Sequence, residues 1–221
     1  MDRLRILITG FGPFPGAPDN PTERLVARLM RLRRPALADV TLQGHTFHVS
    51  YGAVDRDLPT LLALHQPHAV LMFGLAQRTP FVRIETRARN AVTTLWPDAD
   101  QNRGLAAQIA HEAAADLHFG PHTARLLRAA QQSGVWARPS RDAGRYLCNY
   151  LSWLAIEASR APGGPLLTAF VHVPPIPRDA TGRRLGQGQR VGFEELVDAG
   201  EAMLVTLVAL TRQQLRTTAS G

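Results

Sequence analysis

The chain of 221 residues contains one cysteine, and its surroundings suit a reactive thiol. Cys148 lies in the stretch Arg145-Tyr146-Leu147-Cys148-Asn149-Tyr150, at the start of a helix that the sequence predicts over about residues 145–159. The positive end of a helix dipole lowers the pKa of a thiol in the first turn and raises its thiolate fraction. Cys148 is therefore a candidate nucleophile, although free cysteines are also common as small buried apolar residues.

One histidine interrupts an apolar run. His172 follows Ala169-Phe170-Val171 and precedes Val173 and two prolines, which places it near the C-terminal end of a predicted buried strand. In α/β sheets, ligands usually bind at that end of the strands. We expect this strand beside the helix of Cys148, so His172 can act as a base for the thiol. The alternative is a core histidine that is bonded to a backbone group.

A base histidine needs a partner on its far nitrogen that fixes its tautomer and orientation. Residues 81–90 alternate well enough to predict one strand, with Arg83, Glu85, Arg87 and Arg89 on its polar face. Glu85 is the candidate for that partner. A solvated strand residue paired with Arg83 or Arg87 is the competing interpretation.

The first glycine-rich loop offers a pocket wall rather than a phosphate site. Gly10-Phe11-Gly12-Pro13-Phe14 follows a predicted strand, but its spacing matches neither a Walker loop nor a dinucleotide fingerprint, and the chain contains no lysine. Phe11 and Phe14 could wall an apolar pocket or serve only the core. Paired cysteines and metal-binding histidine motifs are missing from the sequence, so we expect neither a metal nor a cofactor.

Apolar runs alternating with helical patterns indicate how these residues are held. We expect strands at residues 4–9, 40–50, 68–73, 81–90, 135–138 and 166–173, and helices at about 21–30, 123–132, 145–159 and 193–215, with residues 58–65 lying in a further helix. Asn20 can cap the first helix and Pro21 suits its first position. Continuously apolar strands imply a sheet that is covered on both faces.

The predicted fold class is therefore α/β: a single-domain three-layer sandwich with a mixed, mostly parallel twisted sheet and helices on both faces. We expect one domain over residues 1–216 and a flexible tail at 217–221, with a loop-rich insertion at 98–122.

Composition excludes several classes of function. The net charge is +7, but the arginines are scattered among acids and no zinc or aromatic-basic motif accompanies them, so we expect no nucleic-acid partner. The apolar stretch at 202–210 is shorter than the roughly 18 to 20 residues that cross a bilayer, so we expect no membrane association. The N-terminal run Ile6 to Ile8 is too short for a signal peptide, and a lone cysteine suits a reducing cytoplasm.

Six short motifs occur in an order and spacing that extend over nearly the whole chain, and together they resemble the pyroglutamyl peptidase I (pyrrolidone-carboxylate peptidase) family. They are Thr9-Gly10-Phe11-Gly12-Pro13-Phe14, Asn20-Pro21-Thr22, Gly74-Leu75-Ala76, Ile84-Glu85 with Asn90, Leu147-Cys148-Asn149-Tyr150, and Phe170-Val171-His172-Val173-Pro174.

The resemblance implies a cytosolic cysteine exopeptidase that removes N-terminal pyroglutamate from peptides without a cofactor, often as a tetramer or dimer. It implies a triad of Cys148 as nucleophile, His172 as general base and acid, and Glu85 as the residue that orients His172. It also implies that Phe11 and Phe14 flank the lactam ring, and that the backbone N–H of Cys148 helps to stabilise the oxyanion. Two alternatives stay open: a related cysteine amidase for another lactam or small acyl amide, and a silent homologue that binds pyroglutamyl peptides.

Three positions depart from the family pattern. The family usually has an arginine ten residues after its catalytic glutamate, where this chain has Leu95. Arg87 or Arg89 is expected to substitute for it from the strand of Glu85. Leu75 stands where many members have glutamine, so it is a candidate substrate contact, and the stretch Gln77-Arg78-Thr79-Pro80 also differs.

Overall fold

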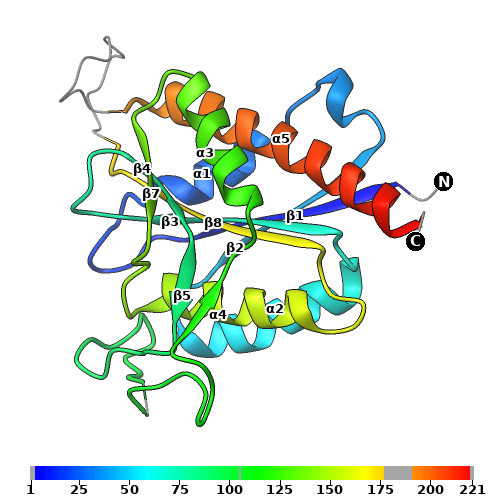
Figure 1. The fold of residues 1–221 in the computed structure, drawn as a ribbon. Helices are drawn as coiled ribbons and strands as arrows, with labels where there is room; N and C mark the ends of the chain where they lie inside the picture. The colour runs from blue at the N-terminus through cyan, green and yellow to red at the C-terminus, as the bar shows by residue number, and fades with distance from the viewer. Residues whose placement is uncertain (1–2, 105, 177–190, 220–221) are drawn as a thin grey trace.

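The computed structural model describes residues 3–104, 106–176 and 191–219. Six strands form its central sheet (Figure 1). In spatial order they are β2 (Val40–Phe47), β1 (Leu4–Phe11), β3 (Ala69–Leu75), β8 (Leu167–Val173), β4 (Val82–Glu85) and β7 (Ala137–Ser140). Every neighbouring pair is parallel except β8 and β4, which run antiparallel. The prediction of a mixed, mostly parallel sheet is confirmed.

Helices cover both faces of this sheet (Figure 1). One face carries α1 (Pro21–Leu29), α3 (His122–Gln132) and α5 (Phe193–Ala219), and the other carries α2 (Tyr51–His65) and α4 (Leu147–Arg160). A short 3₁₀ helix, η1 (Pro35–Leu37), precedes β2. Within the described residues, no helix is long and apolar enough to cross a membrane.

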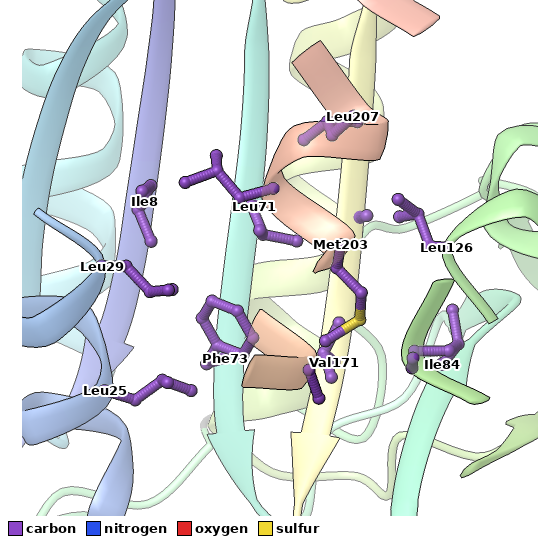
Figure 2. Packing of buried hydrophobic residues seen from close by; sticks show 14 of the residues in the cluster. Ile8, Leu25, Leu29, Leu71, Phe73, Ile84, Leu126, Val171, Met203 and Leu207 are labelled. Carbon is purple, nitrogen blue, oxygen red and sulfur yellow. The ribbon is translucent and has the colours of Figure 1, made fainter. Parts of the chain in front are cut away.

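The strands are hydrophobic at nearly every position because each face of the sheet is covered by an apolar layer. Because side chains alternate along a strand, Ile8 and Leu71 face α1 and α5, whereas Leu7 and Met72 face α2 and α4. Figure 2 shows the first layer, in which sheet residues interlock with residues of three helices: Ile8, Leu71, Phe73, Ile84, Val171, Leu25, Leu29, Leu126, Met203 and Leu207. Burying a side chain of this size contributes about 1.5–3 kcal/mol.

The first helix is attached firmly to the end of β1. Asn20 caps α1 by accepting a hydrogen bond from Thr22 N, as its sequence signal predicts. The Thr22 hydroxyl contacts both backbone groups of Phe11, at 3.0 and 2.9 Å. The loop between them, which contains Phe14, is thereby anchored at both ends.

The strand expected over residues 81–90 is wrong in one respect. It breaks at Thr86, whose N–H and hydroxyl both donate to Ser140 O, and only β4 stays in the central sheet. Residues Arg87–Arg89 form β5, which pairs with β6 (Asp116–His118) in a separate two-stranded sheet. The pairing partner lies in the insertion at 98–122, where no strand was expected.

The C-terminal helix is longer than the sequence indicates. α5 continues to Ala219, past the expected end near residue 215, so residues 217–219 of the expected tail are helical. Residues 220–221 lie outside the described part of the chain.

Candidate active site

A cavity of about 760 Å³ lies where β3 and β8 end, within the size range of small-ligand sites. Segments far apart in the sequence supply its walls, among them the loop after β1, the strand β4 and the start of α4. The lining residues include Phe14, Leu75, Arg83, Trp96, Asp98, Asp142, Tyr146, Cys148 and His172. Two of the three predicted catalytic residues, Cys148 and His172, therefore share one cavity.

Glu85 reaches the same site through the register of two strands. In the antiparallel pair of β4 and β8, Arg83 lies opposite His172 and Ile84 lies opposite Val171. Glu85 is one residue further along, so its side chain meets His172 diagonally, on the same face as Arg83. Glu85 Oε1 lies 2.7 Å from His172 Nδ1, and these two residues are only 0% and 3% exposed.

The charges around His172 fix its tautomer. Ionised Glu85 can only accept a hydrogen bond, so Nδ1 must carry the proton that it donates to Glu85. Arg83 Nη2 lies 3.1 Å from the same Nδ1, but a protonated Nδ1 cannot accept from it. Nε2 of a neutral His172 is then left with its lone pair, which is the form that a general base requires.

The pKa directions at these two residues agree with that assignment. Burial lowers the pKa of His172 below its usual value, although the Glu85 hydrogen bond and charge oppose this effect. For Glu85, burial raises the pKa, but the hydrogen bond and charge of His172, with further contributions from Ser140 and Arg83, bring it below its usual value. At neutral pH the pair is therefore a neutral imidazole beside a carboxylate.

Cys148 is the second residue of α4, close to where the sequence predicts a helix start. Its sulfur packs against Gly74, because a Cβ added to that glycine would lie 2.8 Å from Cys148 Sγ. Gly74 lies opposite His172 in the parallel pair of β3 and β8. Neighbouring strands are about 4.8 Å apart, so the sulfur and the imidazole lie above adjacent strands.

The expectation of a lowered thiol pKa is wrong. Burial, together with the nearby charge of Glu85, raises the pKa of Cys148 to about 12, although the charge of Arg83 opposes them. The helix N-terminus is present, but desolvation of the thiolate outweighs it. Cys148 is therefore a neutral thiol at rest, and it needs a base to remove its proton.

The predicted substrate contacts divide into two groups. Phe14 and Leu75 line the cavity. Phe11 is not among its lining residues: it is 3% exposed and packs in the core, with its ring 5.8 Å from that of Phe47. A direct contact between Phe11 and substrate stays a prediction, and the geometry favours a supporting role behind the wall.

The structure does not favour the expected stabilisation of the oxyanion by Arg87 or Arg89. Arg87 pairs with Asp116 at 2.6 Å and Arg89 pairs with Asp142 at 3.2 Å, and neither arginine lines the cavity. Leu95, where the family pattern has arginine, is 74% exposed. Oxyanion assistance by Arg87 or Arg89 stays a prediction.

Two residues at the site have structural connections that sequence reasoning missed. Arg83 contacts both Glu85 and His172: its pairing with Glu85 was one of the sequence interpretations, but its contact with His172 depends on the antiparallel pairing with β8, which the sequence did not indicate. Asn149 is fully buried, and its side chain bonds to both backbone groups of Arg89, which ties β5 to the helix of Cys148. Its position next to Cys148 was the only available signal.

The described part of the chain contains no evident metal-binding site. Within it, no group of three or more histidine, cysteine, aspartate or glutamate side chains is arranged to hold a metal ion.

A family model described as pyroglutamyl peptidase matches residues 4–209. The chain belongs to this family. It is accordingly a cysteine peptidase of the pyroglutamyl-peptidase type, and the resemblance stated from its motifs is confirmed.

Individual relatives support the assignment over most of their length. Pyrrolidone-carboxylate peptidase of Pyrococcus furiosus is 30% identical over 186 residues, which cover 84% of this chain and 88% of the relative. The protein of the same name from Gloeobacter violaceus is 27% identical over 177 residues, or 80% and 84% of the two chains. The solved structure of pyrrolidone carboxyl peptidase from Thermococcus litoralis has a TM-score of 0.82 at 27% identity, covering 95% of this chain and 96% of that one.

Proposed function

We propose that this protein removes N-terminal pyroglutamate from peptides through an acyl-enzyme on Cys148, with His172 as base and acid and Glu85 as its orienting partner. The observation that carries the proposal is the 2.7 Å contact between Glu85 and the buried Nδ1 of His172, at the wall of a cavity that also holds the thiol. This is the arrangement that activates a nucleophile through an oriented base.

The reaction begins with the proton of Cys148, because a thiol with a pKa of about 12 is not ionised at neutral pH. His172 Nε2 takes this proton as Sγ forms a bond to the pyroglutamyl carbonyl carbon. The bond between this carbonyl carbon and the nitrogen of the following residue then breaks, and His172 returns the proton to the departing amine. Water hydrolyses the thioester, with His172 accepting its proton and restoring the thiol, and free pyroglutamate leaves.

The oxyanion that forms on the way needs hydrogen-bond donors. Cys148 lies in the first turn of α4, where backbone N–H groups have no partner within the helix. Its own N–H and the positive end of the helix are the donors that we assign to the oxyanion.

The cavity supports an uncharged ring better than a free amino group. Phe14 and Leu75 give it apolar walls, and its two carboxylates are already engaged. Asp98 accepts from three backbone N–H groups, whereas Asp142 pairs with Arg89 and accepts from Gly144 N. An ammonium group entering this site would lose its hydration without a free acidic partner, which the lactam avoids.

The test is cleavage of a chromogenic pyroglutamyl amide by the purified protein, beside the corresponding amides of proline and alanine. Turnover of the pyroglutamyl amide alone supports the proposal. Turnover of other acyl amides at comparable rates favours a broader cysteine amidase. Binding of a pyroglutamyl peptide without turnover favours a silent homologue, the alternative that Leu95 keeps open.

Two further expectations accompany this function. A cytoplasmic location and assembly as a dimer or tetramer stay predictions. Light scattering on the purified protein tests the second, and a monomer at all concentrations would contradict it.

A further inference from the structure

One cation lies at the centre of the proposed triad. A single guanidinium nitrogen of Arg83, Nη2, lies 3.1 Å from Glu85 Oε1 and 3.1 Å from His172 Nδ1, and it donates to the backbone carbonyl of Asp142 at 3.1 Å. The Arg83 side chain is 23% exposed and lines the cavity together with Cys148.

We propose that Arg83 is a positioning residue of this site: it holds Glu85 and the imidazole of His172 in place and puts a positive charge on the cavity wall near Cys148. This inference rests on the proposed function, and the role differs from the oxyanion assistance that the sequence suggested for Arg87 or Arg89.

The geometry of the strands places Arg83 beside His172 and places Arg87 and Arg89 elsewhere. Arg83 and Glu85 lie on one face of β4, two residues apart, and Arg83 is the residue directly opposite His172 on β8. The chain leaves the central sheet after Glu85, and the guanidinium groups of Arg87 and Arg89 turn to Asp116 and Asp142. Of these three arginines, Arg83 alone lines the cavity.

The contacts also explain how Arg83 can act on its neighbours. Glu85 Oε1 receives both the Nδ1 proton of His172 and Arg83 Nη2, so a single guanidinium nitrogen anchored on Asp142 O holds the carboxylate that orients the base. Removing the guanidinium would take away one of the groups that hold Glu85 against Nδ1.

A second effect is electrostatic. At the thiol, burial and the charge of Glu85 both raise the pKa, whereas the charge of Arg83 lowers it. Arg83 therefore offsets the one carboxylate that opposes formation of the thiolate, and it also lowers the pKa values of Glu85 and His172. Asp142, which acts on His172 in the opposite direction, is partly neutralised by Arg89.

The test compares Arg83→Gln and Arg83→Lys with Arg138→Gln as a matched control. Arg138 lies opposite Arg83 on the next strand, but its guanidinium stacks on Trp136 and Phe81 and it does not line the cavity. Two readouts are used: kcat and KM on a pyroglutamyl amide, and the rate at which iodoacetamide alkylates the only cysteine at about pH 8.5. At that pH the rate is proportional to the thiolate fraction, so a rise of one pKa unit slows it about tenfold.

We expect Arg83→Gln to slow alkylation about tenfold and to lower kcat about 100-fold with little change in KM, after circular dichroism shows that it folds. Arg83→Lys keeps the charge, but its side chain is one atom shorter and does not bring a nitrogen to all three partners, so alkylation should return to within about threefold of the wild type while kcat stays at least tenfold low. Arg138→Gln should match the wild type in both readouts.

Wild-type alkylation and kcat in folded Arg83→Gln would overturn the proposal. If that variant does not fold, wild-type kcat in Arg83→Lys would overturn the positioning role. Alkylation needs no substrate, so a wild-type protein that cleaves no pyroglutamyl amide would refute the proposed function while the alkylation series still decides the role of Arg83.

Discussion

Gly74 gives the most direct test of where the nucleophile lies. It is a buried residue of β3, and a Cβ at this position would lie 2.7 Å from Phe170 Cζ and 2.8 Å from Cys148 Sγ. Contacts of this kind are normally about 3.5–4.0 Å. The Gly74→Ala variant therefore requires both neighbours to move away by roughly 1 Å.

Of the two neighbours, Cys148 can move more easily. Phe170 is fully buried in the apolar core, whereas Cys148 borders the cavity and can turn its sulfur into it. Overpacking costs about 1–3 kcal/mol, and replacing glycine in a strand interior regains about 0.5–1 kcal/mol. We expect a net loss of about 0.5–2 kcal/mol in the free energy of unfolding, and a fall of about 100-fold in kcat because the sulfur is displaced by about 1 Å.

The assay combines thermal unfolding with kcat and KM on a pyroglutamyl amide. A loss of that size should lower Tm by about 1–8 °C in a chain of this length. Gly52→Ala is the matched control, because Gly52 is an exposed residue in the first turn of α2 and a Cβ there meets no atom within 4 Å. Wild-type kcat in Gly74→Ala would show that the reactive sulfur does not lie against this glycine.

Other predictions follow from the same site. Cys148→Ala should abolish turnover with little change in Tm, and near wild-type activity would remove Cys148 as nucleophile. A glutaminyl amide should be cleaved far more slowly than the lactam, since the wall at Phe14 offers an ammonium group no partner; comparable rates would contradict this pocket. The activity should fall with decreasing pH as His172 becomes protonated, with an apparent pKa below the usual value of about 6.5; an acid limb above it would contradict a buried neutral base. Arg87→Met and Arg89→Met should lower kcat only a few-fold because both arginines are already paired, and a larger fall at constant KM would restore them as oxyanion donors.

Local signals in the sequence were enough for the layers and for the start of α1, but not for α2, which begins at Tyr51 directly after the strand expected over residues 40–50. Asn20 and Pro21 mark the first turn of α1, and continuous apolar strands require two covered faces, so both features follow from rules that act within a few residues. The fold class was predictable for that reason.

Long-range effects were not predictable in the same way. The break in the strand after Glu85 depends on Ser140, which is far away in the chain. Its backbone carbonyl accepts hydrogen bonds from both the N–H and the hydroxyl of Thr86. The high pKa of Cys148 depends on how deeply the cavity wall is buried, whereas the sequence showed only the helix start. The alternation of side chains along a strand places Arg83 and Glu85 on the same face of that strand. It does not indicate that His172 lies opposite Arg83 on β8.

The antiparallel strand is what makes this site rigid. In a purely parallel sheet, residues at the carboxyl edge come mostly from loops after the strands. Here β4 runs back along β8, so Arg83 and Glu85 reach His172 from inside a hydrogen-bonded ladder. Groups on strands are held more accurately than groups on loops. Changes in the cavity loop around Trp96 should therefore alter substrate fit while leaving the Glu85–His172 contact intact.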